Sequence, residues 1–275
     1  VHAVQFNPSL LSNAEEEDDF GVLLQGGGYV ADEDEFVDSA DDFIDADYVT
    51  SFESAIDNIT SPIDLIQAQI TTIDNNSGTN ADLTVLTTAT GILETNAAQL
   101  TVGTAELSVA TIDLTDGLLT LSEKALRGGL GFGAAIAIPS KKFSVAVSVS
   151  NSTTFSGLLR VAESDTNTLI NYTVATDDYA GVVSDYAAAA NASAVTILKI
   201  QNALDVNHAD FDPDEALRLT NEDYAENETT LAAASTALDT FTYGGAGRPA
   251  SEGDTVIFEN GALASGADTI TLASE

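Results

Sequence analysis

Acidic side chains are the residues of this sequence that offer the most chemistry, and one short run spaces them like cation ligands. Asp210, Asp212 and Asp214 occupy alternate positions, which is how a calcium loop of the EF-hand type begins. The run then departs from that motif, because Glu215 replaces the turn glycine and Asn221 replaces the bidentate glutamate. A weak calcium site is therefore one hypothesis, and a helix N-terminus capped by Asp212 is the alternative that we favour.

Catalytic constellations are otherwise scarce. The sequence has only two histidines, His2 and His208, and no cysteine, which excludes disulfides, zinc–thiolate sites and thiol catalysis. His208 has Asp205 and Asp210 nearby in the sequence, but no serine nucleophile completes a triad. Carboxylates are so numerous that no pair stands out as the acid and base of a glycosidase. We expect a protein that is not an enzyme and that has no cofactor besides the calcium hypothesis.

The charge balance restricts the partners. The 275 residues include 44 acidic and 8 basic side chains, for a formal net charge of −36. Nucleic-acid binding is not expected, because few cations are present to neutralise phosphates. The negative charge also disfavours docking on an anionic membrane surface. It favours solubility in salt, the binding of cations, or the binding of a basic protein partner.

The start of the sequence suggests export. The sequence contains no methionine and begins at Val1, so Val1 follows a processing step or the sequence is a piece of a longer chain. Both interpretations fit an exported protein whose signal peptide has been removed. The sequence also lacks an uncharged apolar run of the roughly 18 residues that a membrane-spanning helix needs. We therefore expect an exported protein of the periplasm, outer membrane or cell surface.

The longest regular pattern predicts a helical hairpin over residues 31–127. Leucine recurs every seventh residue in its second half, at Leu86, Leu93, Leu100, Leu107, Leu114 and Leu121. An apolar stripe with 4-3 spacing precedes it, at Phe52, Ile56, Ile59, Ile63, Ile66, Ile70 and Ile73. Residues 75–79, with the sequence NNSGT, are typical of a turn. Two apolar stripes joined by a short turn indicate two long antiparallel helices.

Local signals set the expected limits of these helices. Asp32 is expected to cap the first helix, and Pro62 to kink it or to divide it in two. The second helix should run over about 80–126 and end at Gly128 and Gly129, because paired glycines favour helix termination.

The clearest strand signal follows the hairpin. Large apolar residues alternate with small ones over 130–138 and again over 143–150, and the turn PSKK separates the two runs. This pattern predicts a β-hairpin with one apolar face. Further strands are expected at 158–161 and 169–175. Ahead of the hairpin, 20–24 is expected to be a short strand, closed by Gly26–Gly28 acting as a flexible turn.

A second helical hairpin is expected over 177–242. Its helices should cover 177–205 and 213–241 and be joined near 206–212, with Asp212 as N-cap and Pro213 in the first turn. The remainder, 243–275, is rich in Gly, Ala and Ser, with short strands expected at 255–258 and 269–272. The predicted organisation is therefore an α+β protein with segments 1–30, 31–127, 128–176, 177–242 and 243–275.

Two stretches resemble a known family. They are FNPSLL at 6–11 followed by EDDFGVLL at 17–24, and GLGFGAAIAIPSKKF at 129–143. In sequence, order and spacing, residues 1–160 are similar to TraF-like conjugal transfer proteins of Gram-negative bacteria. The resemblance implies an exported protein, grouped with outer-membrane barrels related to FadL, that acts in plasmid transfer and envelope assembly. The resemblance does not imply a catalytic or ligand-binding role for any residue of this sequence. The strands expected here are too few to close a barrel, so they would form an incomplete barrel of the outer-membrane type.

Two functional hypotheses follow. The first is a structural or assembly protein of the cell envelope, at the outer membrane or in the periplasm, that acts with other protein subunits. The second is a secreted filament subunit that associates with itself through open strand edges. Recovery with the outer membrane would favour the first, and ordered fibres in electron micrographs of the purified protein would favour the second.

Overall fold

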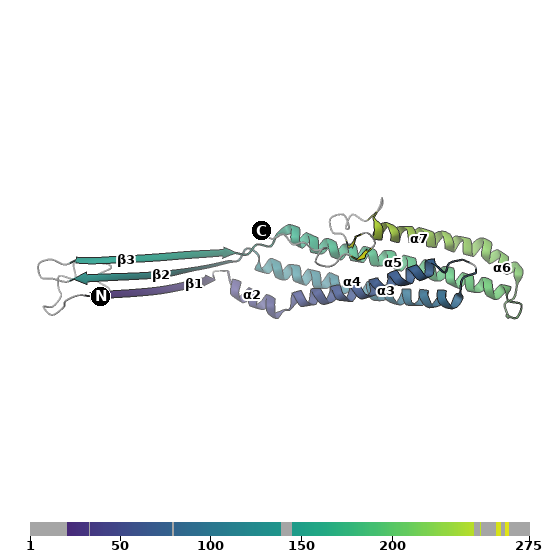
Figure 1. The fold of residues 1–275 in the computed structure, drawn as a ribbon, viewed down its shortest axis with the longest axis horizontal. Helices are drawn as coiled ribbons and strands as arrows, with labels where there is room; N and C mark the ends of the chain where they lie inside the picture. The colour runs from purple at the N-terminus through teal and green to yellow at the C-terminus, as the bar shows by residue number, and fades with distance from the viewer. Residues whose placement is uncertain are drawn as a thin grey trace. The chain divides into compact units, whose positions relative to one another are not determined.

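The computed structural model describes residues 21–32, 34–78, 80–138, 145–244, 248, 257–259 and 262–263. It is an α+β structure, mostly helical, with a three-stranded antiparallel sheet, as the sequence predicted (Figure 1). The chain divides into two compact units. The first comprises Val1–Asp45 and Thr120–Val161, and the second comprises Ala46–Leu119 and Ala162–Glu275. Within the described part of the chain, no helix combines the length and apolar character that crossing a membrane requires.

The first unit is built on a sheet with strand order β1-β2-β3. Its strands are β1 (Gly21–Asp32), β2 (Ala125–Ile138) and β3 (Val145–Leu158), and both pairings are antiparallel. The predicted hairpin is therefore confirmed, with longer strands than expected. The predicted strand at 20–24 continues to Asp32, so Gly26–Gly28 do not form a turn. β3 ends at Leu158, so the strand expected at 158–161 is absent.

Large side chains on neighbouring strands explain why glycines are tolerated within this sheet. A Cβ atom placed on Gly129 would lie 2.6 Å from the Tyr29 ring, and one placed on Gly128 would overlap the Phe155 ring. Each aromatic residue is the register partner of the glycine that it covers. An aromatic ring laid over a glycine restores apolar contact in a strand that would otherwise be weak. Gly128 and Gly129 consequently lie inside β2, and the prediction that they end the preceding helix was wrong.

Helix α2 (Phe36–Asp45) follows β1 directly. The Asp32 carboxylate accepts hydrogen bonds from the backbone N–H groups of Phe36 and Val37, at 2.6 and 2.8 Å. These are N–H groups of the first helical turn, which have no partner within the helix. The Asp32 side chain therefore caps the helix as predicted, but Asp32 is the last residue of β1 and does not occupy the N-cap position.

The second unit contains the predicted hairpin of α3 (Tyr48–Asp74) and α4 (Leu83–Leu121), except for the last two residues of α4. All six heptad leucines of α4 are buried, and so are Phe52, Ile59, Ile63, Ile66 and Ile73 of α3. The Asn76 side chain closes the turn, because it accepts from the Asp82 N–H at 3.1 Å and donates to the Asp82 carbonyl at 2.9 Å.

The interruption in the first helical arm lies upstream of the proline. Pro62 is buried inside α3 and does not divide it, contrary to one of the outcomes predicted. The break between α2 and α3 instead lies at Asp47, which adopts a left-handed conformation with φ of 54°. Aspartate tolerates this conformation better than most residues because its short side chain can bond locally.

Helix α5 (Glu163–Leu204) replaces the strand that was expected at 169–175. Its buried residues over 169–176 are Leu169, Tyr172, Thr173, Ala175 and Thr176. Of these, Leu169, Tyr172, Thr173 and Thr176 follow the helical spacing i, i+3, i+4, i+7. The helical face was hidden because threonines occupy half of these positions.

The second predicted hairpin is confirmed, with one refinement. Its second arm consists of α6 (Pro213–Leu219), a π-helical turn η2 (Thr220–Tyr224) and α7 (Ala225–Tyr243). The Asn227 amide on α7 donates to the Thr196 hydroxyl on α5 at 2.8 Å.

A short hairpin of β4 (Phe258–Glu259) and β5 (Ala262–Leu263) follows these helices. Phe258 is buried against Tyr179 of α5 and Phe241 of α7, with ring centroids 4.7 and 6.4 Å away. β4 coincides with the end of the strand predicted at 255–258, and the strand predicted at 269–272 lies outside the described residues.

Candidate functional site: the acidic turn of α6 and the open sheet

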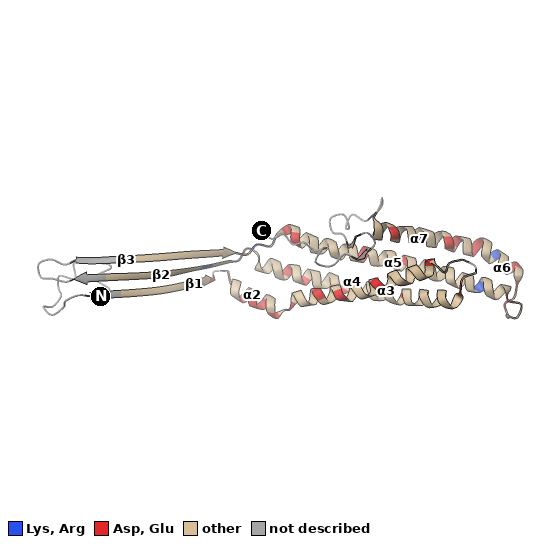
Figure 2. Cartoon of the chain, viewed as in Figure 1, with Lys and Arg blue, Asp and Glu red and all other residues tan. Residues whose placement is uncertain are grey.

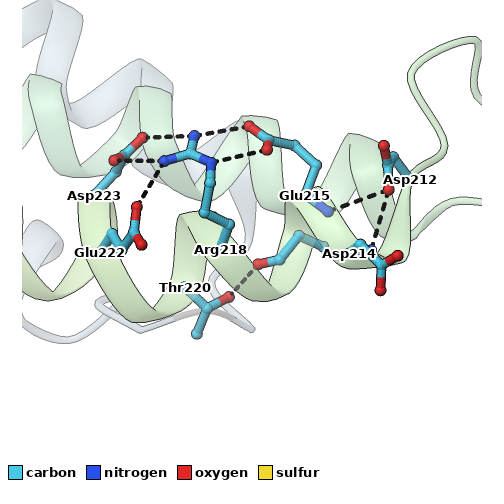
Figure 3. Close-up of polar contacts among 8 residues, drawn as sticks. Asp212, Asp214, Glu215, Arg218, Thr220, Glu222 and Asp223 are labelled. Carbon is cyan, nitrogen blue, oxygen red and sulfur yellow. Dashed lines mark hydrogen bonds and ion pairs between the residues drawn. The ribbon is translucent and has the colours of Figure 1, made fainter.

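The aspartates singled out in the sequence lie around the start of α6. The Asp212 carboxylate accepts hydrogen bonds from the backbone N–H groups of Asp214 and Glu215, both at 3.1 Å (Figure 3). Asp212 is therefore the N-cap of α6, as the alternative interpretation held. The acids at 214 and 215 lie in the first turn, where negative charge complements the positive end of the helix dipole.

Asp210 is part of the preceding turn. Its backbone N–H donates to His208 Nδ1 at 3.2 Å, and its carboxylate lies 3.6 Å from the same nitrogen. In the described ranges of the chain, no group of three or more His, Asp or Glu side chains is arranged to hold a metal ion.

Calcium binding by Asp210, Asp212 and Asp214 stays a prediction that solution measurement can decide. Binding would have to compete with the hydrogen bonds that Asp212 already makes to the first turn of α6. Titration calorimetry of the intact chain would show heat at millimolar calcium for a weak site of this kind. The absence of heat would end the hypothesis.

Arg218 is surrounded by carboxylates on α6 and η2 (Figure 3). Its guanidinium forms two parallel hydrogen bonds to Glu215, at 2.7 and 2.8 Å. It also contacts Glu222 at 3.1 Å and Asp223 at 3.2 Å. The hydrogen bond from Arg218 lowers the pKa of the Glu215 carboxyl. All three guanidinium nitrogens are occupied by this chain's own acids, so the cluster does not present a cation to an anionic ligand.

Polar contacts inside the bundle fix how its long helices lie against one another. The Thr111 and Thr173 hydroxyls, on α4 and α5, are 2.7 Å apart and buried. The Tyr186 hydroxyl of α5 donates to the Asp74 carboxylate of α3 at 2.9 Å. A heptad seam can slide by one repeat, whereas buried polar pairs match in one alignment only. These pairs therefore have a structural role, and sequence reasoning missed them because the partners are 62 and 112 residues apart in the sequence.

Two buried tyrosines make the bundle sensitive to alkali. Burial raises the pKa of Tyr179, and burial together with the neighbouring Asp74 raises the pKa of Tyr186, both from 10.0. Above about pH 10 the unfolded chain loses these protons while the folded chain keeps them. The free energy of unfolding should therefore be steady below that pH and fall as the pH rises further. Urea unfolding at a series of pH values measures this.

Substitution by phenylalanine should separate the two tyrosines. The Tyr179 hydroxyl is buried without a hydrogen-bond partner among the described residues, so Tyr179→Phe should be neutral or stabilising at neutral pH. Tyr186→Phe should cost about 1 kcal/mol because it removes the bond to Asp74. Each variant should weaken the alkaline loss of stability. An unchanged alkaline slope in both would show that other groups cause it.

The sheet differs from the helices in charge. Figure 2 shows acidic residues on the helices, whereas β1, β2 and β3 contain only two charged residues, Asp32 and Arg127. The segment 124–160 contains five basic residues and no acidic one. The sheet segment therefore contrasts with a chain that is acidic elsewhere.

The two faces of the sheet differ in polarity. Register places the exposed side chains of Leu24, Val30, Leu130, Phe132, Val149 and Phe155 on one face. We call this set the apolar face. Gly26, Gly28 and Gly128 lie among these residues on the same face. The opposite face carries Ser150, Ser152, Thr154 and Ser156 of β3, together with the exposed side chains of Tyr29 and Leu158. Leu24, Phe132 and Val149 are 69%, 61% and 68% exposed. A group of large apolar side chains this exposed on one face is unusual and marks an interaction surface.

Fold and site together define a class. It is an α+β chain with long packed helices, an antiparallel sheet with an exposed apolar face, and an arginine whose charge is paired with acids of the same chain. The family profile described as "F plasmid transfer operon, TraF, protein" matches residues 4–248. The chain belongs to this family, and its relation to conjugal transfer follows from that membership. The match extends well beyond the 1–160 on which the resemblance rested. No curated protein and no solved structure matches the chain.

Proposed function

We propose that this protein is a non-enzymatic component of the cell envelope that acts in conjugal transfer. In this proposal it is exported, and it lies at the outer membrane or in the periplasm beside it. Family membership supports the role in transfer. Kinship with the FadL-related outer-membrane barrels stays an expectation from the resemblance.

The observation that carries the envelope location is the apolar face of the sheet. Burying a side chain such as Leu24, Phe132 or Val149 contributes a stabilising free energy of roughly 1.5–3 kcal/mol relative to leaving it in water. A strand with apolar residues on one face and small or hydroxyl residues on the other is typical of sheets that contact lipid on one side. The near absence of charge on the three strands supports the same interpretation, because charge on a lipid-facing surface is costly.

Cell fractionation tests the location. In a Gram-negative host, we expect the protein in the outer-membrane fraction, and recovery from the cytosol alone would contradict the proposal. The triple change Leu24→Thr, Phe132→Thr and Val149→Thr places β-branched residues in the strands while removing three of the six large side chains of the apolar face. It should move the protein to the soluble periplasmic fraction.

A matched control uses the opposite face of the same sheet. The changes Ser150→Thr, Ser152→Thr and Thr154→Ser alter three exposed positions of β3 without removing any large apolar group. This variant should fractionate like the unchanged protein. If both triple variants left the membrane equally, a general loss of folding would be the cause, and circular dichroism would reveal it.

A further inference from the structure

The sheet ends in two long strands whose outer edges are open. In the described part of the chain, β1 and β3 each pair only with β2. β3 has 14 residues, without a charged residue or a proline. Natural edge strands usually carry lysine, proline or a bulge that prevents pairing with another chain. β3 has neither lysine nor proline, so its backbone hydrogen-bonding groups are suited to a further strand.

The charges that flank the two edge strands are opposite in sign. β1 is followed by Asp34 and Glu35 and preceded in the sequence by the acidic run 15–19. β3 is followed by Arg160 and preceded in the sequence by the pair KK at 141–142. Pairing β1 with a second β1, or β3 with a second β3, would bring like charges together. Pairing β3 with the β1 of another molecule brings opposite charges together.

We propose that the outer edge of β3 takes β1 of a second copy of this chain as a parallel fourth strand. In the sheet, β1 and β3 both run antiparallel to β2 and therefore share a direction. A copy added in that direction places its Glu35 end beside Arg160. It also keeps the apolar faces of both copies on the same side, whereas antiparallel addition would turn the second sheet over. The inference does not depend on the envelope location proposed above.

This contact joins different surfaces of the two copies. Such a head-to-tail interface leaves a free β3 edge on one copy and a free β1 edge on the other, so it can repeat into a ring or an open chain. The proposal therefore predicts oligomers larger than a dimer. A two-fold contact would stop at the dimer, so oligomer size distinguishes the two arrangements.

Cysteine cross-linking tests the pairing directly, because the chain has no cysteine of its own. Gly27 on β1 and Ser152 on β3 are both register partners of Gly131, so they lie at the same level of the sheet. A Cβ atom on Gly27 meets nothing within 4 Å, and Ser152 is exposed. Gly27→Cys and Ser152→Cys variants of the full chain are mixed and treated with a short bismaleimide.

The expected product is a cross-linked dimer that forms in the mixture and not in either variant alone. A Ser152→Cys dimer of equal yield in the unmixed sample would overturn the proposal, because it would show a two-fold β3–β3 contact. A chain that stays monomeric at every concentration in sedimentation velocity would also overturn it.

Charge reversal provides a second test. Arg160→Glu places an acid opposite Glu35 of the second copy, and Glu35→Arg places a base opposite Arg160, while the backbone carbonyl of residue 35 can still accept from the Ser39 hydroxyl. Each single variant should associate about tenfold more weakly, because like charges then meet across the contact. Mixing the two variants, or combining both changes in one chain, should restore association.

Lys199→Glu is the matched control, since it makes the same change of charge at an exposed position of α5, outside the sheet unit. An equal loss in this control would assign the effect to net charge and overturn the proposal. Failure of the combined variant to recover would overturn it as well.

Discussion

Replacing Leu100 by alanine should lower the free energy of unfolding by about 3–5 kcal/mol. Leu100 is fully buried in the heptad seam of α4, with a relative exposure of 0%. Leucine and alanine differ little in helix propensity, so the loss reports removed contacts and the cavity left behind. A loss of this size is a large fraction of the stability of an ordinary domain. Urea unfolding followed by circular dichroism measures it.

A matched control lies two residues further along the same helix. Val102 is 59% exposed, so Val102→Ala removes methyl groups that are mostly in water and should change the stability by less than about 0.5 kcal/mol. If Leu100→Ala were as mild as this control, the seam would not be the core of the second unit. The interpretation of the leucine heptad would then be wrong.

Gly103→Ala should be the second large effect, because α3 leaves no room for a side chain at this position of α4. A Cβ atom at Gly103 would lie 2.9 Å from the Ile59 side chain and 3.3 Å from the Asn58 carbonyl oxygen. Ile59 is itself buried and the carbonyl belongs to the backbone, so neither can move aside easily. Overpacking of this kind typically costs about 1–3 kcal/mol. The gain in helix propensity of about 1 kcal/mol offsets part of this cost, so we expect a net loss of stability of up to about 2 kcal/mol.

Gly91 supplies the control, since it lies in the same helix and nothing lies within 4 Å of its Cβ position. Gly91→Ala should therefore stabilise the protein by up to about 1 kcal/mol. The two substitutions are chemically identical, so opposite signs would isolate the helix–helix contact. Stabilisation by both would show that α3 and α4 pack less closely at Gly103 than the structure indicates.

The helical hairpins are the part of the fold that sequence reasoning predicted well. A seven-residue repeat such as that of Leu93 and Leu100 suits one face of a helix and cannot suit one face of a strand. The Asp212 cap could be predicted for a similar reason, because capping depends on residues only two and three positions away. Among the site residues, the interpretation of Asp212 as a helix N-cap was therefore correct. The ion pairs of Arg218 were not predicted from the sequence.

The extent of the sheet was decided by tertiary structure alone. Gly128 and Gly129 have the local character of a helix stop, and they become strand residues because Phe155 and Tyr29 cover them from neighbouring strands. The sequence around Leu169 predicts a strand, whereas in the folded chain Thr173 and Thr176 are buried beside Leu169 and complete a helical face. Repeats and caps act between residues close in the sequence, so composition and spacing reveal them. Strand partners and buried threonines depend on residues distant in the sequence, and only the folded chain brings these together.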